Sequence, residues 1–311
     1  MRHAFLRLVL AIAVTTGLAA KPQAQDPSRP KPETFHSTVD LVTIQASVKD
    51  AHGRIVNGLT TNDFEVRDNG QLRPILSLRS DRESPLSLAI LVDMSGSMRV
   101  DPRIALVRQA YDALLTHLHP DRDEVAVFTF DSSLHDRRDF TRDLSSLRDA
   151  LAEFEPFGTT SLYDATAATA RKLAARSATH KAIIVLTDGV DTSSDMTPRE
   201  VSGLASSIDV PVFVVVTVPW LDQRLMLNAM ERSMPSDSAD LRDLAEWTGG
   251  QVMFATTPAE TVVASTQLID GLRQQYVLAI EAAIGREWRR LDVRVRRPST
   301  FVKARSGYFA G

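Results

Sequence analysis

The stretch PLSLAILVDMSGSM, residues 85–98, joins a continuous apolar run to a cluster of oxygen-bearing side chains. Such a run is typical of a strand that is buried on both faces, as in a parallel sheet. The run ends at Asp93, and Ser95 and Ser97 follow around Gly96, a residue that lets a loop bend tightly. Either serine could simply cap a following helix. The stretch predicts a buried strand and leaves the role of its polar end open.

Strands and helices alternate on the C-terminal side of this stretch. Further apolar runs typical of strands occupy residues 124–130, 181–189, 210–218 and 251–255. Helical periodicity follows Asp101-Pro102, and we expect more helices at 143–153, 161–176 and, after Thr-Pro-x-Glu capping boxes, from Thr197 and from Thr257 to about Arg273. This alternation predicts an α/β fold, a Rossmann-like, doubly wound and mostly parallel sheet with helices on both faces.

Two regions with strand periodicity flank the α/β part. Apolar and polar residues alternate after Leu41, and Asn69-Gly70 is a strong hairpin signal. Alternation returns from Tyr276 onward. Because two or three lone strands cannot bury a core, we expect both regions to form one small β-sandwich into which the α/β domain is inserted. The predicted boundaries are 37–82 for the N-terminal β region, 83–274 for the α/β domain and 275–311 for the C-terminal β region.

The N-terminus has the pattern of a secretory signal. A basic start precedes the apolar stretch Leu8–Ala20, which is shorter than the roughly 20 residues that span a bilayer. Small residues and a proline-rich segment follow. We therefore interpret residues 1–24 as a signal peptide and 25–36 as a linker. Export to the periplasm or the exterior is expected, with membrane anchoring if the signal stays uncleaved and no stable membrane span after cleavage.

Composition excludes several kinds of site. The net charge of −3 gives no electrostatic reason to expect nucleic-acid binding. The chain has no cysteine, which removes disulfides, thiolate catalysis and cysteine-ligated metals. Any metal site must therefore use oxygen or imidazole ligands.

Polar side chains gather at one predicted edge of the sheet. Ligands of parallel α/β sheets bind beyond the carboxyl ends of the strands, and both Asp93 and Asp188 end predicted strands. The segment FGTTSLYDA, 157–165, adds Thr159 and Thr160 before a helix. Each residue alone is explained as a cap or turn residue. Together, carboxylates and hydroxyls on one edge favour a site for Mg²⁺ or Mn²⁺.

The same residues resemble a known family. DMSGS, 93–97, matches the Asp-x-Ser-x-Ser signature of von Willebrand factor type A domains. GTT, 158–160, and TDG, 187–189, lie where that family has its metal-binding threonine and its last aspartate. The resemblance covers about 85–275. The flanks resemble, less specifically, those of bacterial exported "VWFA-related" proteins.

The resemblance implies a metal ion-dependent adhesion site. Ser95, Ser97 and Thr160 would ligate Mg²⁺ or Mn²⁺ by hydroxyl, and Asp93 and Asp188 would act directly or through water. An open position on the metal would then accept a Glu or Asp side chain of a protein partner. This predicts a binding module and not an enzyme.

Three alternatives to an adhesion site concern the same residues. A phosphatase-like, metal-dependent hydrolase would place its nucleophile at Asp93, but it would need a second acid where Ser95 stands. A serine hydrolase would need a base, and no histidine lies in the motif segments. A purely structural β-sandwich protein with a vestigial site is the third possibility.

Three further hypotheses concern segments outside the motif. The Trp-, Leu- and Met-rich segment 219–240 is either a specificity loop beside the metal or a short helix packed on the domain. The helix at 258–273 runs into a strand, so its movement could link the metal site to the sandwich. The arginine cluster at 286–297 is interpreted as a solvated strand face in preference to a surface for an anionic partner.

Overall fold

The computed structural model describes residues 40–80, 84–100, 102–152, 155–178, 180–218 and 241–310. Residues from Val39 to Gly311 form one compact unit. The predicted signal peptide, the linker at 25–36 and the segment 219–240 lie outside the described residues.

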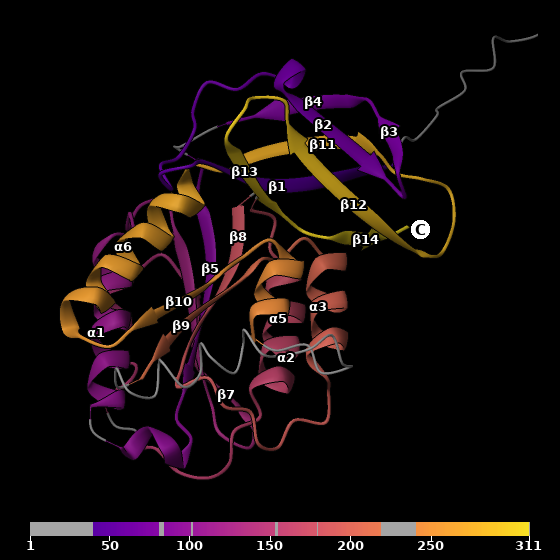
Figure 1. The fold of residues 1–311 in the computed structure, drawn as a ribbon. Coiled ribbons are helices and arrows are strands. Elements are labelled where there is room, and N and C mark those ends of the chain that lie inside the picture. Colours follow the sequence, from indigo (N-terminus) through magenta and orange to yellow (C-terminus); the bar gives the residue numbers. More distant parts are fainter. Residues whose placement is uncertain are drawn as a thin grey trace, which may run out of the picture. The chain divides into compact units, whose positions relative to one another are not determined.

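A six-stranded sheet forms the centre of the α/β part, in the order β10-β9-β8-β5-β6-β7 (Figure 1). All neighbouring strands are parallel except β6 and β7. The strands are β5 (Leu86–Asp93), β6 (Glu124–Phe130), β7 (Leu134–Thr141), β8 (His180–Thr187), β9 (Val212–Thr217) and β10 (Val252–Ala255). The predicted doubly wound, mostly parallel sheet is confirmed.

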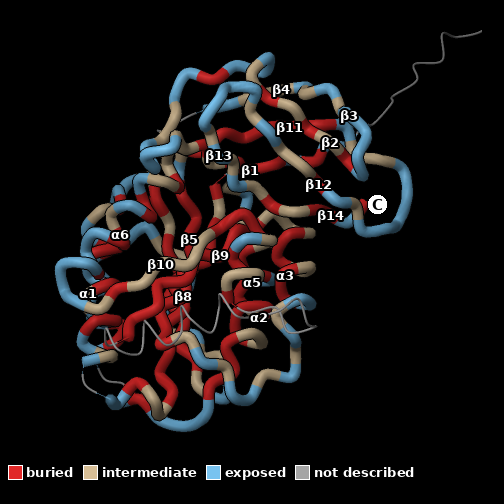
Figure 2. The backbone as a smooth tube through the Cα atoms, viewed as in Figure 1, coloured by how far each residue is buried: buried red, intermediate tan, exposed pale blue. Residues whose placement is uncertain are grey.

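Helices cover both faces of this sheet. Helices α1 (Arg103–Thr116) and α6 (Pro258–Arg273) pack on one face, where Ile90 of β5 points. Helices α2 (Leu162–Ala174), α3 (Pro198–Ser207) and α5 (Leu241–Thr248) pack on the other, where Leu91 points. Every residue of β5 is buried, and Figure 2 shows the central strands as the buried interior. The apolar run that starts at Leu86 is thus a strand covered on both sides.

A β-sandwich is built from strands of both chain ends. Its two four-stranded sheets have the orders β13-β1-β11-β4 and β14-β12-β2-β3. The strands are β1 (Leu41–Asp50), β2 (Phe64–Asp68), β3 (Gln71–Arg73), β4 (Ile75–Arg79), β11 (Tyr276–Glu281), β12 (Trp288–Val295), β13 (Thr300–Ala304) and β14 (Gly307–Phe309). Phe64 and Tyr276 meet edge to face between the sheets, with ring centroids 5.3 Å apart. The predicted sandwich is confirmed.

The Asn69-Gly70 hairpin also forms as predicted. Both residues have positive φ, 48° at Asn69 and 82° at Gly70. This conformation matches the twist of the flanking strands, and Asp68 pairs directly with Gln71 across the turn.

Two local predictions were wrong. Of the predicted helix at 143–153, the described residues 143–152 form no α-helix and contain a 3₁₀ turn, Leu144–Leu147. Asp143 explains the failure, because its carboxylate accepts from the Ser145 backbone N–H and Ser146 donates to its carbonyl, an alternative to helical bonding. Strand β7 was not predicted, because its mostly polar sequence lies at the sheet edge and buries no residue fully. At the start of α1, the N-cap is Pro102, and the predicted cap Asp101 is outside the described residues.

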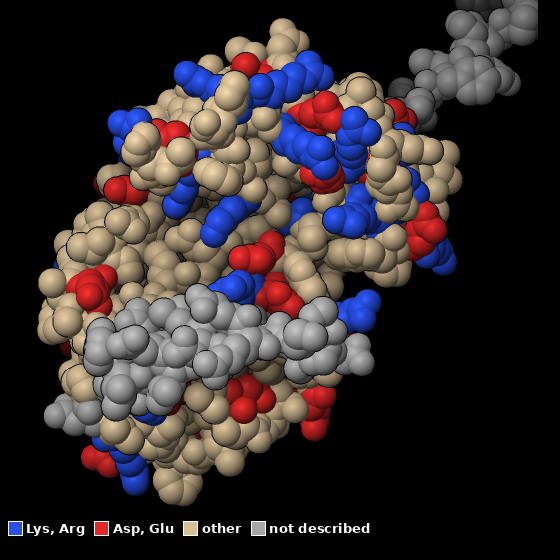
Figure 3. Space-filling model, viewed as in Figure 1, with Lys and Arg blue, Asp and Glu red and all other residues tan. Residues whose placement is uncertain are grey.

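Two arginines of the cluster at 286–297 form ion pairs within the chain. Arg289 donates to the buried Asp68 at 2.7 Å, and Arg294 pairs with Asp292 at 2.6 Å. Basic and acidic side chains alternate over the sandwich surface (Figure 3). Arg289 and Arg294 therefore have counter-ions within the sandwich.

Hydrogen bonds to backbone carbonyls join the sandwich to the α/β part. Arg305, which is 5% exposed, donates to the Ser206 carbonyl at 2.6 Å, and the Ser306 N–H donates to the Trp247 carbonyl at 2.8 Å. Gly249 has φ 87°, and a Cβ there would lie 2.8 Å from the Arg305 nitrogen. Only glycine fits this close approach.

Thr197→Ala is expected to destabilise the fold by about 1 kcal/mol. Thr197 accepts from the Glu200 N–H, and the Glu200 carboxylate accepts from the Thr197 N–H, so the predicted capping box is complete. At Thr257 only half of the predicted box forms, because Glu260 accepts from Thr256 instead. Urea unfolding measures the effect. Arg199→Ala on the same helix is the control, and an equal loss in both variants would contradict the capping assignment.

Candidate metal centre

The predicted site lies where the order in which the chain adds strands to the sheet reverses. Strand β5 is central, with β6 on one side and β8 on the other. The chain leaves β5 toward β6 and later returns across it to β8, so the connections diverge at the carboxyl ends of β5 and β8. Ligands bind at such switch points in open α/β sheets. Asp93 is the last residue of β5, and Asp188 directly follows β8.

The Asp93 side chain forms a hydrogen bond between these two strands. Its side chain is fully buried, and its Oδ1 accepts from the Ser95 backbone N–H at 2.9 Å. Its Oδ2 accepts from the Thr187 hydroxyl at 2.6 Å. Thr187 was not predicted as a site residue, although it directly precedes Asp188. Both donors are neutral, so they orient the carboxylate without balancing its charge.

Burial raises the pKa of Asp93 from 3.8 to about 6. The hydrogen bonds from Ser95 and Thr187 oppose this rise in pKa, and the nearby charge of Asp188 adds to it. An ionised carboxylate in this position carries a desolvation cost that a neighbouring cation would relieve.

Ser95 and Ser97 lie side by side, with their hydroxyl oxygens 3.1 Å apart. Ser95 is the N-cap of the 3₁₀ turn Gly96–Arg99, yet its side chain makes no capping hydrogen bond. The Gly96 N–H donates to the Gly158 carbonyl at 2.9 Å, and a Cβ on Gly96 would lie 3.2 Å from that oxygen. The explanation of Ser95 as a cap is therefore not supported, and its loop packs tightly against the segment that carries Thr160.

Thr160 is 3% exposed and is held through its backbone. Its N–H donates to the Thr192 hydroxyl at 2.9 Å, and its carbonyl accepts from the N–H groups of Thr192 and Ser193. The N-terminus of α2 is capped by Asp191, which accepts from the Leu162 N–H at 2.8 Å. Thr160 is therefore not the cap of this helix. The segment that carries Thr160 is hydrogen-bonded to the segment after Asp93 and to the segment after Asp188.

Asp188 has one paired and one unpaired oxygen. Oδ2 accepts from Nη1 of Arg103 at 2.7 Å, and Asp188 is only 1% exposed. Oδ1 is buried and accepts no hydrogen bond from any group in the described part of the chain. Arg103 was missed in the sequence, where a basic residue in the first turn of an amphipathic helix is ordinarily solvated.

The residues at this rim fit a hard divalent cation. They offer only carboxylate and hydroxyl oxygens, which such cations prefer. Across the described ranges, no group of three or more His, Cys, Asp or Glu side chains is placed to hold a metal. A cation at this rim would therefore depend on hydroxyl ligands, and the buried, unpaired Oδ1 of Asp188 is an oxygen that a metal or its water would satisfy.

A histidine near the rim contacts a carboxylate. His135 contacts Asp131, the residue after β6, with 3.2 Å between Nε2 and Oδ1. Burial would raise the pKa of Asp131, but hydrogen bonds from His135 and from the Ser133 N–H hold it below its ordinary value. The pair resembles an ordinary surface contact, because the His135 side chain is 40% exposed.

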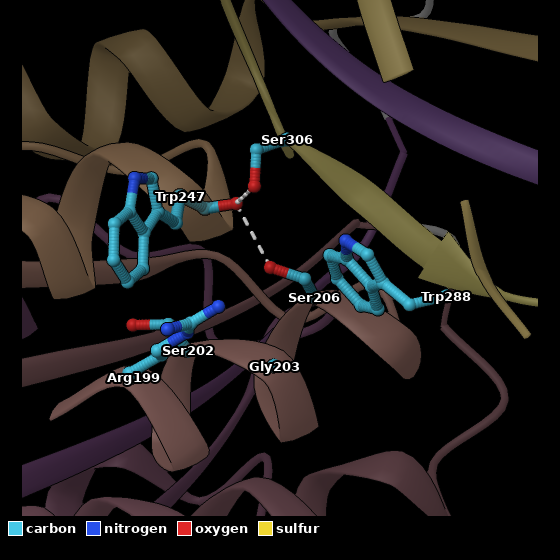
Figure 4. Close-up of a pocket in the computed structure, with 7 residues that line it drawn as sticks. All are labelled: Arg199, Ser202, Gly203, Ser206, Trp247, Trp288 and Ser306. Atoms are coloured by element: carbon cyan, nitrogen blue, oxygen red, sulfur yellow. Dashed lines mark hydrogen bonds between the residues drawn. The ribbon is translucent and has the colours of Figure 1, made fainter. Parts of the chain in front are cut away.

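A separate cavity of about 540 Å³ has walls from α3, α5, β12 and the loop before β14. Trp247 and Trp288 lie on opposite sides of it (Figure 4). Ser206 and Ser306 both donate their hydroxyls to the Trp247 carbonyl, at 2.8 and 3.1 Å. None of the predicted metal-site residues lines this cavity, and these two hydroxyl donors serve the joint between sandwich and α/β part.

Comparison with known proteins gives one family match and several similar solved structures. A family model described as the von Willebrand factor type A domain matches residues 88–199. BatB from Bacteroides thetaiotaomicron is a similar solved structure, 18% identical over 60% of this chain and 98% of its own, with a TM-score of 0.47. A von Willebrand factor type A protein from Catenulispora acidiphila is 13% identical over 89% of this chain and 75% of its own, with a TM-score of 0.48.

The von Willebrand factor domain of the type V pili tip protein Mfa5 from Porphyromonas gingivalis is a third similar structure. It is 24% identical over 35% of this chain and 39% of its own, with a TM-score of 0.31. No curated protein matches the chain. The matched residues 88–199 include Asp93, Ser95, Ser97, Thr160 and Asp188. By this match, residues 88–199 of the α/β part are von Willebrand factor type A domain sequence.

Proposed function

We propose that this chain is a protein-binding module whose rim site holds Mg²⁺ or Mn²⁺ and captures an acidic side chain of a partner through that cation. Von Willebrand factor type A domains often mediate adhesion or protein interactions. The observation that carries the proposal is the pair of buried carboxylates at one rim, Asp93 with neutral donors only and Asp188 with an unpaired oxygen.

The proposed ligands divide into two kinds. Ser95, Ser97 and Thr160 offer neutral hydroxyls, and Asp93 and Asp188 offer charge, either directly or through water. Hydroxyl ligands neutralise nothing, so a bound cation would stay electrophilic and attract a further oxygen ligand.

The charge balance at the rim favours an acidic ligand. Asp93 and Asp188 bring two negative charges, and Arg103 brings one positive charge to the second of them. A divalent cation would reverse the remaining negative charge and leave one excess positive charge. A single carboxylate from a partner neutralises it, whereas a basic group would be repelled.

Turnover by the same rim is the alternative function. A phosphatase-like hydrolase with Asp93 as nucleophile would need a second acid where Ser95 stands. A serine hydrolase would need a base beside its nucleophile, but the Ser95 hydroxyl contacts Ser97 and the nearby His135 contacts Asp131. Binding without turnover therefore has the better support, and phosphate release is included as an outcome of the test below.

Export is part of the proposal and rests on the predicted signal peptide at 1–24. Among the residues that the structure describes, no helix is both long and apolar enough to cross a membrane.

The chain is expected to be retained on a surface coated with glutamate peptide in Mg²⁺ or Mn²⁺, and released by EDTA. Surface plasmon resonance measures this, with a glutamine peptide as the matched neutral surface. Asp93→Asn should abolish retention, while Asp112→Asn, an equal charge change at an exposed position of α1, should leave it unchanged.

Retention that ignores EDTA would contradict the metal-bridged mechanism. Metal-dependent release of phosphate from p-nitrophenyl phosphate, lost in Asp93→Asn, would favour the hydrolase instead.

A further inference from the structure

We infer that Arg103 is a resident cation of the rim site, which weakens the binding of a divalent metal and strengthens the capture of an acidic ligand. This inference rests on the proposed function. It concerns a residue outside the motif, and it predicts effects of opposite sign on the two binding steps.

The contacts of Arg103 place it within the candidate site. Its Nη1 lies 2.7 Å from Asp188 Oδ2 and 3.4 Å from the Ser97 carbonyl oxygen. The Arg103 side chain is 17% exposed and that of Asp188 is 1% exposed. One guanidinium thus contacts two of the proposed metal-binding residues in a mostly buried setting, where charges interact more strongly than in water.

The chain connectivity places the backbone of Arg103 near the rim. Arg103 is the first residue of α1, directly after the turn that carries Ser95 and Ser97. The Arg103 N–H donates to the Val100 carbonyl at 2.9 Å, which fixes the start of the helix against that turn. The backbone of Arg103 is therefore tied to the segment that holds the hydroxyls.

The two oxygens of Asp188 allow an arginine and a metal to share one carboxylate. Oδ2 is bonded to Arg103, and Oδ1 is buried and unpaired in the described part of the chain. A divalent cation or its water could approach Oδ1 while the guanidinium stays on Oδ2. The two cations would then repel each other across Asp188, and this repulsion lowers metal affinity.

The same repulsion helps a carboxylate ligand. With arginine and metal both present, the rim carries an excess positive charge that only a negative ligand removes. Without the arginine, the dication and the two aspartates balance, so an incoming carboxylate gains less. Arg103 thus lowers the affinity of the site for metal and raises its selectivity for acidic partners.

Arg99 provides a matched control on the same segment. It donates to the Pro156 carbonyl at 2.6 Å, and its guanidinium lies 5.9 Å from the centre of the Phe157 ring. Replacing Arg99 by Met removes the same charge from the neighbourhood without touching Asp188.

The test compares wild type, Arg103→Met, Arg103→Gln and Arg99→Met in the full chain. Isothermal titration calorimetry with MnCl₂ gives metal affinity, and retention on the glutamate-peptide surface at saturating Mn²⁺ gives ligand capture. Both Arg103 variants should bind Mn²⁺ roughly tenfold more tightly or better, because one positive charge leaves a poorly solvated site. Their retention on glutamate should fall by a similar factor. Arg99→Met should change either value less than twofold.

The outcomes separate this inference from the proposed function. Unchanged or weaker Mn²⁺ binding in folded Arg103 variants would overturn the inference. If Arg103→Met fails to fold, as judged by circular dichroism, Arg103→Gln carries the test, since its amide retains a donor toward Asp188. Mn²⁺ binding by the Arg103 variants but not by wild type would support the inference and refute the proposed function, because the arginine would then replace the metal. No Mn²⁺ binding by any variant would overturn both.

Discussion

Asp93→Asn should raise the thermal stability of the chain in EDTA and abolish the stabilisation that Mg²⁺ gives to wild type. Burial raises the pKa of Asp93 from 3.8 to about 6 in the folded state. A carboxyl group with a raised folded-state pKa makes the fold less stable as the pH rises from about 4 to about 6. The charge costs folding roughly 3 kcal/mol at neutral pH, since one pKa unit corresponds to about 1.4 kcal/mol. Asparagine removes this cost and can still accept from the Ser95 N–H.

Differential scanning calorimetry at neutral pH, in EDTA and in Mg²⁺, measures both effects. In EDTA the variant should melt several degrees above wild type. In Mg²⁺ wild type should gain about 2.7 kcal/mol at a hundredfold excess over Kd, and the variant should gain nothing. Asp112→Asn should behave as wild type in both buffers. A variant less stable than wild type in EDTA would instead make Asp93 a structural carboxylate, stabilised by Ser95 and Thr187.

Asp123→Ala should destabilise the chain by roughly 3–5 kcal/mol, equally in Mg²⁺ and in EDTA. Asp123 is fully buried and accepts from the Leu86 N–H at 3.1 Å and the His119 N–H at 2.7 Å. It also pairs with Arg273, whose side chain is 11% exposed. Alanine would leave a largely buried guanidinium and two backbone donors without their acceptor. The loss is a large share of the 5–15 kcal/mol that stabilises a typical domain.

Urea unfolding of both variants distinguishes this effect from a loss of surface charge. Asp121→Ala, an exposed neighbour in the same turn, should stay within about 0.5 kcal/mol of wild type. A loss of less than about 1 kcal/mol in Asp123→Ala would show that the network is not a major source of stability.

The Asp123–Arg273 pair also bears on the predicted coupling of the last helix. Arg273 is the last residue of α6, and β11 begins shortly after it at Tyr276. The ion pair fastens this helix end to the turn before β6. If α6 moves and pulls on the sandwich, the Asp123–Arg273 ion pair must either break or move with the helix. The coupling stays a prediction.

The fold was predictable where local pattern and burial agree. The apolar run ending at Asp93 indicated a strand covered on both faces. The two flanking β regions, 37–82 and 275–311, were each too small to bury a separate core. The prediction failed at Asp143, where short polar side chains bond to nearby backbone groups and replace a helix with a turn. It also failed at β7, because an edge strand needs little apolar surface.

The candidate site was predictable only in part. Asp93, Ser95 and Ser97 are neighbours in sequence, and Asp188 was placed at the same edge because it ends a predicted strand. Thr160 was chosen over Thr159 by family resemblance. The hydrogen bonds of the structure connect these segments. Arg103 could not be found by either route. Its importance lies in a contact with Asp188, 85 positions away in the chain, and no local pattern encodes that contact.

Uptake of a divalent cation at this rim is measured most directly by titrating the purified chain with Mn²⁺ and following the electron paramagnetic resonance signal of the free ion. Wild type should remove one equivalent of Mn²⁺ from solution, Mg²⁺ should displace it, and Asp93→Asn should leave the Mn²⁺ free. A wild-type chain that leaves all Mn²⁺ free at millimolar concentration would contradict the assignment of Asp93, Ser95, Ser97, Thr160 and Asp188 as a metal site.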